Sequence, residues 1–130
     1  MPLTALVVDD SMLIRHTVCR FLEERGFSVQ TASDGREALE ILKKLHPDLI
    51  ITDLQMPNMN GGELITALRA GKTTSKIPIV TVAGKHGVCG ETEKRADFSI
   101  HKDIDIEDQL TKALEATVGA ALRKNQSAGK

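Results

Sequence analysis

The segment LIITDLQMPNMNGGEL, residues 49–64, combines a strand, a turn and a helix start. Its first four residues form a short β-branched apolar run, which predicts a strand buried on both faces. Asp53 ends this run, and Pro57 and two glycines follow as turn residues. Asn60 and Glu63 have the spacing of a helix cap, so a helix is expected to start here. Its apolar face comprises Leu64, Ile65 and Leu68.

Short apolar runs and amphipathic stretches alternate along the rest of the chain. Ser11 and Asp34 are predicted helix N-caps, and Gly26 and Pro47 are predicted to end these two helices. A last helix is expected to start near Asp105. Further strands are expected at residues 3–8, 27–31, 77–83 and 98–101. The apolar faces comprise Ile14, Val18, Phe21 and Leu22, then Ala38, Leu39, Leu42 and Leu45, and then Leu110, Leu114, Val118 and Leu122.

Charged residues stand at the ends of three expected strands. Asp9 and Asp10 follow the first strand, Asp53 ends the third and Lys102 follows the fifth. Apolar strands separated by helices predict a parallel sheet covered on both faces, and such sheets bind ligands at the carboxyl ends of their strands. The four charges are therefore expected to meet at one edge. Adjacent carboxylates at a buried strand end repel each other, and a buried strand end is a poor place for unpaired charge.

Composition narrows the classes of function. The 17 Lys and Arg residues nearly balance the 18 Asp and Glu residues, so direct binding to nucleic acid or to an anionic membrane is not expected. Three Phe, with no Trp or Tyr, offer few stacking surfaces for a base or a flavin. The N-terminus resembles neither a signal peptide nor a membrane span. Cys19 and Cys89 are expected to be free thiols, and a cytoplasmic protein is expected.

Three motifs together resemble the receiver domain of two-component response regulators: Asp9-Asp10-Ser11 after the first strand, the 49–64 segment, and Lys102 after the fifth strand. The resemblance covers about residues 3 to 122, and the 49–64 segment is its most specific part. It implies a flavodoxin-like α/β fold, a doubly wound five-stranded parallel sheet in (βα)5 order. One receiver domain is expected over residues 1–124, and residues 125–130 are expected to be a disordered tail.

The resemblance also implies a role for each site residue. Asp53 would be the phosphoacceptor, a carboxylate nucleophile that forms an acyl phosphate. Asp10, Asp53 and the backbone carbonyl of Gln55 would hold Mg²⁺, with Asp9 acting through a bound water. Lys102 would place its ammonium against the phosphoryl oxygens.

Two switch positions depart from the family pattern. Receivers usually carry Thr or Ser near the end of the fourth strand, where this chain has Ala83, and an aromatic residue on the fifth strand, where it has Ser99. Thr81 shares a face with Ala83 but lies about 7 Å back along the strand, so only a shifted register would bring it forward. Phe98 is expected to point to the opposite face from Ser99. The usual hydroxyl and aromatic switch is therefore expected to be absent.

The segment around the fifth strand departs as well. Asp103 follows Lys102 where the family commonly has a proline after a cis peptide, and a trans bond is expected here. Gly84, Gly87 and Gly90 predict a short or irregular fourth helix, and hence a specialised face of the domain. His86 and Cys89 in this segment are too few ligands for a closed zinc site.

Each motif taken alone has an ordinary structural explanation. Asp10-Ser11 would serve as a helix cap, the prolines and glycines as turns, and Lys102 as a solvated side chain. Their coincidence at the ends of three strands favours the receiver interpretation. A magnesium-dependent phosphohydrolase would need a further acid or base, and Gln55 stands where an aspartate is common.

Two functions remain in competition. The first is a phosphoacceptor receiver in a two-component or phosphorelay pathway, which is not an enzyme beyond its own self-catalysed phosphorylation. Its partners would be a histidine kinase or histidine phosphotransfer protein and a downstream protein target, and a homodimer is left open. The second is a degenerate pseudo-receiver that serves as a docking module independent of phosphorylation, a hypothesis that Ala83 and Ser99 motivate.

Overall fold

The computed structural model describes residues 3–53, 61–72, 74–83, 98–101 and 105–119. Within these residues five strands form one sheet, in which every neighbouring pair is parallel and the order is β2-β1-β3-β4-β5. The predicted doubly wound five-stranded parallel sheet is confirmed. The strands are β1 (Thr4–Val8), β2 (Ser28–Ala32), β3 (Leu49–Asp53), β4 (Ile79–Ala83) and β5 (Phe98–His101).

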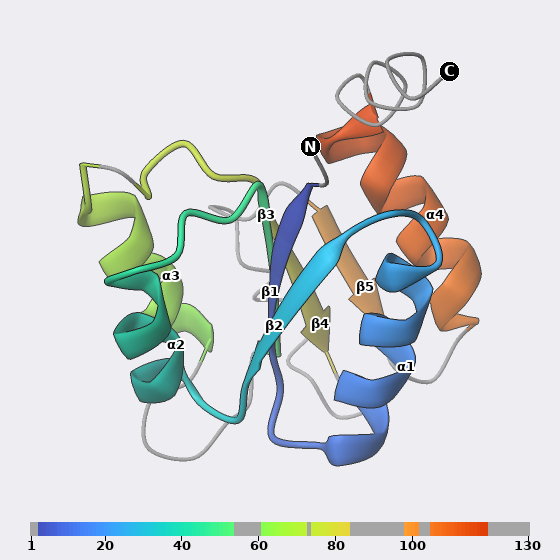
Figure 1. The fold of residues 1–130 in the computed structure, drawn as a ribbon, viewed down its shortest axis with the longest axis horizontal. Coiled ribbons are helices and arrows are strands. Elements are labelled where there is room, and N and C mark those ends of the chain that lie inside the picture. Colours follow the sequence, from blue (N-terminus) through green and yellow to red (C-terminus); the bar gives the residue numbers. More distant parts are fainter. Residues whose placement is uncertain (1–2, 54–60, 73, 84–97, 102–104, 120–130) are drawn as a thin grey trace.

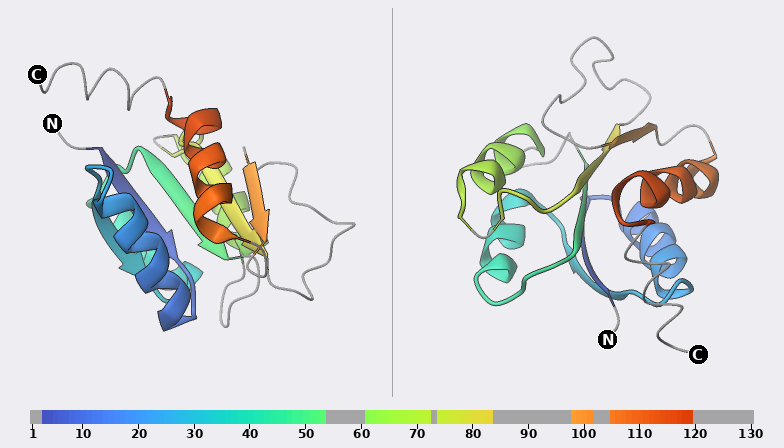
Figure 2. Two further views of the ribbon diagram at one scale, coloured as in Figure 1. Left: turned by 90° about the vertical axis from the view of Figure 1, so that its right-hand side faces the viewer. Right: turned by 90° about the horizontal axis from the view of Figure 1, so that it is seen from above.

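Helices cover both faces of the sheet. Figures 1 and 2 show α2 and α3 together on one side and α1 and α4 together on the other. Because each helix hides one apolar face of the strands, β1 and β3 read as almost continuous apolar runs. In the described part of the chain the helices are α1 (Met12–Glu23), α2 (Gly35–Leu42), α3 (Gly61–Ala70) and α4 (Ile106–Thr117).

The alternation of side chains along the strands divides the interior into two cores. One core joins α1 and α4 to one face of the sheet, and the other joins α2 and α3 to the opposite face. The helix residues of the first core include Val18, Phe21, Leu22, Leu110, Ala113 and Leu114. Those of the second core are Ala38, Leu42, Leu64, Ile65 and Leu68. The predicted apolar faces of the helices are thus confirmed in the described residues, except that Leu45 lies beyond the end of α2 and outside the core.

Side chains cap three of the described helices, at the predicted N-caps Ser11 and Asp34 and at Asp105, near which the last helix was expected to start. Ser11 Oγ accepts a hydrogen bond from the Ile14 N–H, at 3.3 Å, at the start of α1. Asp34 accepts from the Glu37 N–H, at 2.9 Å, at the start of α2. Asp105 caps α4 in the same way. Each contact satisfies a backbone donor that has no partner inside the helix.

The observed boundaries differ from the predicted ones at several ends. Strands β1, β2 and β4 begin one or two residues later than expected, and β2 extends to Ala32. Helix α2 ends at Leu42 rather than just before Pro47, because Lys43 and Lys44 donate to carbonyls three residues back and tighten the last turn. Several predictions fall outside the described residues. They are the short helix expected between β4 and β5 with its glycines, His86 and Cys89, the Lys102–Asp103 bond, the cap at Asn60, and the domain boundary near residue 124.

Cys19 lies on α1, partly buried against the first core, and carries a free thiol as predicted. Burial raises the pKa of this thiol, the charge of Glu23 raises it further, and Arg15 opposes the shift. A thiol with a raised pKa is a poor nucleophile at neutral pH. No helix in the described residues combines the length and the apolar composition that a bilayer crossing requires.

Gly26 ends the turn after α1 with φ of +90°, in the region that favours glycine. A Cβ added there would meet no other atom within 4 Å, so the strain of a substitution would come from the backbone alone. We expect Gly26→Ala to lower the free energy of unfolding by about 1–2 kcal/mol, measured by urea denaturation. Gly26→Asn is the matched control and should lose less, because asparagine tolerates a positive φ. Equal losses in the two variants would contradict this explanation.

Candidate functional site

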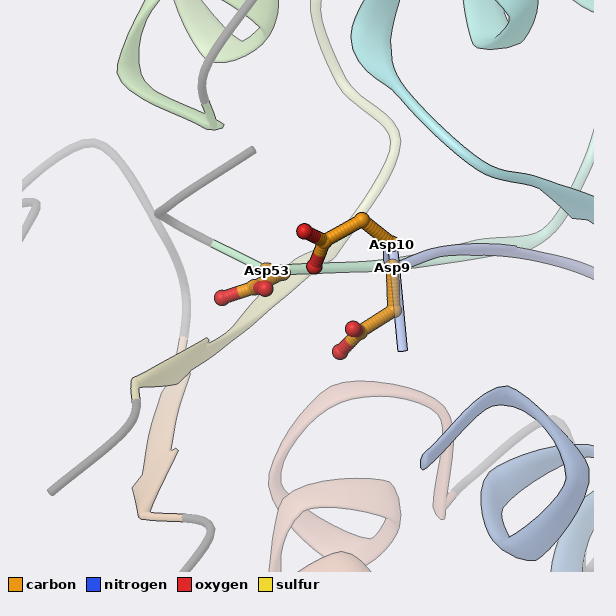
Figure 3. A group of neighbouring side chains, drawn as sticks. All are labelled: Asp9, Asp10 and Asp53. Carbon is orange, nitrogen blue, oxygen red and sulfur yellow. The ribbon is translucent and has the colours of Figure 1, made fainter. Parts of the chain in front are cut away.

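Three aspartates meet where β1 and β3 end. The register pairs Val8 with Thr52, so the next residues on these neighbouring strands are Asp9 and Asp53, and Asp10 follows directly. One carboxylate oxygen from each of the three residues lies within 4.8 Å of the corresponding oxygens of the other two. Figure 3 shows the three carboxyl groups directed into the same space beyond the strand ends. We call these three residues the acidic cluster.

The position of the acidic cluster follows from the strand order. From β1 the chain crosses to β2 on one side and then to β3 on the other, so the connections diverge between β1 and β3. Ligands of open α/β sheets bind at such a point, outside the carboxyl ends of the strands. The acidic cluster therefore occupies the position where this architecture places a binding site.

Burial distinguishes the members of the acidic cluster. Asp9 is 1% exposed and Asp53 is 2% exposed, whereas Asp10 is exposed to solvent. Charged carboxylates are costly to bury unless nearby groups compensate them, and three at this separation repel one another. Carboxylate oxygens in such a group are suitable ligands for a hard divalent cation such as Mg²⁺. The donor set thus fits the predicted metal.

Hydrogen bonds with β2, with the N-cap Ser11 and with α1 hold Asp9 in place. Its N–H donates to the Ala32 carbonyl at the end of β2, at 3.1 Å. Its Oδ1 accepts from the Ser11 N–H at 2.8 Å, and its carbonyl accepts from Arg15 Nη1 at 2.6 Å. Main chain and side chain are therefore both restrained where the strand passes into α1.

Hydroxyl side chains lie just behind the acidic cluster. Thr52 is fully buried, and its Oγ1 donates to the Asp53 carbonyl at 3.0 Å. Thr81, also fully buried, pairs with Thr52 on one side and with Ser99 on the other. Its Oγ1 donates to Ser99 Oγ at 2.8 Å. This hydrogen bond links β4 to β5.

The register of β3 and β4 shows whether Thr81 takes the place of the hydroxyl that is missing at Ala83. Val82 is the partner of Asp53, and Thr81 is the partner of Thr52, one residue before the end of β3. Thr81 has therefore not moved forward to the end of its strand, and Ala83 occupies the position after Val82, opposite His101. Phe98 packs against the first core, as predicted, so Ser99 faces the other side. The predicted site residues Gln55 and Lys102 lie outside the described residues.

Sequence reasoning missed the residues that support the acidic cluster. Arg15 and Thr52 were not singled out, although both hydrogen-bond to backbone carbonyls of cluster residues. A signal was present for Arg15, since a basic residue four positions after a helix N-cap projects from the first turns of that helix.

A separate pocket of about 300 Å³ lies on the α1 and α4 side of the sheet. No member of the acidic cluster lines it. Its lining consists of His16, Thr17, Arg20, Phe21, Glu24 and Glu107.

Known proteins share both the sequence pattern and the fold. The response regulator receiver domain family matches residues 5–115. Response regulator MprA of Mycolicibacterium vanbaalenii is 33% identical over 115 residues, which is 86% of this chain and 49% of MprA. The nitrate/nitrite response regulator NarL of Escherichia coli is 32% identical over 121 residues, 91% of this chain and 56% of NarL. The chain thus spans about half the length of these curated relatives.

Solved structures agree with the sequence comparisons. The chemotaxis response regulator CheY4 of Vibrio cholerae superposes with a TM-score of 0.79 at 32% identity, over 90% of this chain and 99% of that one. The family match covers most of the chain, and the fold and the acidic cluster are those that the resemblance implied. The chain belongs to the response regulator receiver domain family.

Proposed function

We propose that the chain accepts a phosphoryl group on Asp53 and signals through protein contacts in a two-component or phosphorelay pathway. The observation that carries this proposal is the acidic cluster, in which a buried carboxylate at the end of β3 lies beside two others. In the reaction, an Asp53 oxygen attacks phosphorus, an acyl phosphate forms, and the bond from phosphorus to the donor breaks. The donor's leaving group departs with the electron pair.

The attack brings one anion towards another, so compensating positive charge is needed. Mg²⁺ held by Asp10, Asp53 and the Gln55 carbonyl, with Asp9 acting through a bound water, would supply that charge and hold the phosphoryl oxygens. Lys102 would supply a second positive charge. Within the described residues, the parallel register directs Asp53 towards the same open edge as Asp10. That placement puts the proposed nucleophile at the edge of the sheet from which a donor would approach.

A protein donor is supported by the surface beside the acidic cluster. Met12 and Leu13, in the first turn of α1, are 75% and 73% exposed and are the large apolar side chains that stand out as exposed in the described chain. They directly follow Asp10 and Ser11, the N-cap of α1. We propose that a histidine kinase or histidine phosphotransfer protein contacts them while its phosphohistidine reaches Asp53.

The docking-module alternative does not explain the acidic cluster. Holding three carboxylates within 4.8 Å, two of them almost fully buried, destabilises the folded chain, and a docking surface has no need of that arrangement. A metal-assisted phosphoacceptor does need it. We therefore prefer the phosphoacceptor function, in a signalling protein that is not a metabolic enzyme.

The first experiment is intact-mass spectrometry of the protein with Mg²⁺ and acetyl phosphate, repeated with a panel of phosphorylated histidine phosphotransfer domains. We expect one phosphoryl adduct on the wild type and none on Asp53→Asn, because the amide is not a comparable nucleophile. Asp108→Asn is the matched control, an exposed aspartate on α4 that forms a surface ion pair, and it should be phosphorylated normally. An adduct on Asp53→Asn, or none on the wild type with either donor class, would contradict the proposal.

Magnesium binding should be visible in stability. At about one hundred times the dissociation constant, Mg²⁺ should raise the free energy of unfolding of the wild type by about 2.7 kcal/mol in urea titrations. Asp10→Asn should lose most of this gain. In EDTA, without Mg²⁺, its free energy of unfolding should be higher than that of the wild type, because one repelling charge is removed. Asp108→Asn should retain the full gain. An undiminished gain in Asp10→Asn would exclude Asp10 as a ligand.

The hydrogen bond between Thr81 and Ser99 bears on how phosphorylation is communicated. Ser99 is small and its Oγ accepts from a buried Thr81 hydroxyl, so no aromatic side chain can rotate at this position. We propose that the signal leaves the site without a side-chain rotation at residue 99. The two hydroxyls instead stabilise the pairing of β4 with β5.

A double-mutant cycle tests this role. Thr81→Val and Ser99→Ala should each destabilise the protein, with a coupling of about 0.5–1.5 kcal/mol in urea denaturation, the usual contribution of one such hydrogen bond. Ser99→Ala should still form the phosphoryl adduct, because the pair lies behind the acceptor. Additive losses would show that the bond contributes nothing, and loss of the adduct would place Ser99 in the phosphorylation site.

A further inference from the structure

We propose that Arg15 is a positioning residue for the acidic cluster, acting through the backbone of Asp9 on the geometry of the metal ligands. Its side chain reaches back from α1 to the segment that follows β1, and Nη1 donates to the Asp9 carbonyl at 2.6 Å. This inference rests on the proposed function, because it concerns the same metal site.

The contact closes a small hydrogen-bonded loop around the first two cluster residues. The Arg15 N–H donates to the Ser11 carbonyl at 3.0 Å, while the Arg15 side chain reaches Asp9. The Ser11 N–H in turn donates to Asp9 Oδ1 at 2.8 Å. Arg15 therefore holds both ends of the segment from Asp9 to Ser11, and Asp10 lies between them.

Arg15 also supplies the restraint that β2 cannot provide. The Asp9 N–H bonds to the Ala32 carbonyl of β2, which fixes the backbone on the donor side only. The Asp9 carbonyl has a separate restraint, because the Arg15 guanidinium of α1 donates to it. Hydrogen bonds from a charged donor are short and stronger than neutral ones, and the planar guanidinium is partly preorganised. With both the N–H and the carbonyl held, the side chains of Asp9 and Asp10 are directed into the space shared with Asp53.

The charge of Arg15 and its hydrogen bond predict opposite effects on metal binding. A positive charge close to the cluster repels a cation, so if charge alone mattered, removing it would tighten Mg²⁺ binding. If the hydrogen bond positions the ligands, removing it would weaken Mg²⁺ binding, as the loss of groups that orient metal ligands generally does. The direction of the change therefore identifies the role of the residue.

Isothermal titration calorimetry with Mg²⁺ alone, on the full chain, tests the inference. We expect Arg15→Gln to weaken Mg²⁺ binding about tenfold, the lower end of the range for groups that orient metal ligands. Arg15→Lys should give an intermediate affinity, because its ammonium retains the charge and can donate hydrogen bonds but lacks the planar fork of the guanidinium. Arg20→Gln is the matched control, since it removes the same charge from an exposed position on the same helix, and it should bind close to wild type. Urea denaturation of each variant confirms that it is folded.

The outcomes separate this inference from the function on which it rests. Unchanged or tighter Mg²⁺ binding by Arg15→Gln overturns the positioning role while leaving the metal site intact. Absence of binding by the wild type overturns the metal site itself. Amide hydrogen exchange in the metal-free protein then decides the role of Arg15 independently. Exchange of the Ser11 N–H should accelerate in Arg15→Gln more than exchange at Val18 on the same helix, and equal changes at both amides overturn the inference.

Discussion

The parallel pairing of β1 with β3 is the constraint on which the site depends. It brings Asp9 and Asp53 to the same edge of the sheet, and two carboxylates buried there would separate if the strands were free to move. The strands are not free, because both are covered by apolar helices on each face. The free energy of burying those apolar side chains holds together a group of charges that repel one another. The fold thus holds repelling carboxylates together at one place, where binding of a cation would be favourable.

The supports of the site are arranged in layers behind that edge. The Asp9 N–H donates to β2, its carbonyl accepts from Arg15 of α1, and its side chain accepts from the Ser11 N–H. Behind Asp53, the buried hydroxyl of Thr52 binds the carbonyl of the proposed nucleophile. These groups do not carry the proposed chemistry themselves. They limit how far the carboxylates can move apart, which matters because binding and reaction depend on sub-ångström placement.

Carboxylates stand where β1 and β3 end, whereas β4 and β5 are joined by uncharged side chains. The hydrogen bond between Thr81 and Ser99 ties the two strands by small polar side chains, and Ala83 contributes no hydroxyl at the end of β4. Receivers of the usual pattern place a hydroxyl and an aromatic side chain at these positions. In this chain the acidic cluster contains three carboxylates, and the neighbouring strands are joined by the Thr81–Ser99 hydrogen bond.

The sequence by itself determined the class of fold and three members of the site. The apolar strand ending in Asp53, the adjacent Asp9 and Asp10, and the helix caps at Ser11, Asp34 and Asp105 depend on local patterns, and local patterns can be read from neighbouring residues. The ends of β2 and α2 were misplaced by one to several residues, because they depend on strand pairing and on the last hydrogen bonds of a helix rather than on residue type.

Tertiary structure alone decided which side chains support the site. Arg15 reaching the Asp9 carbonyl and Thr81 reaching Ser99 are contacts between elements, and their existence depends on the register of strands and the rotation of a helix. Neither the strand register nor the rotation of a helix can be read from residue types and their spacing along the chain. The carboxylates could be named from the sequence because a parallel sheet gathers its strand ends in one place. The groups that hold them required the packed structure, because only packing sets distances between residues remote in sequence.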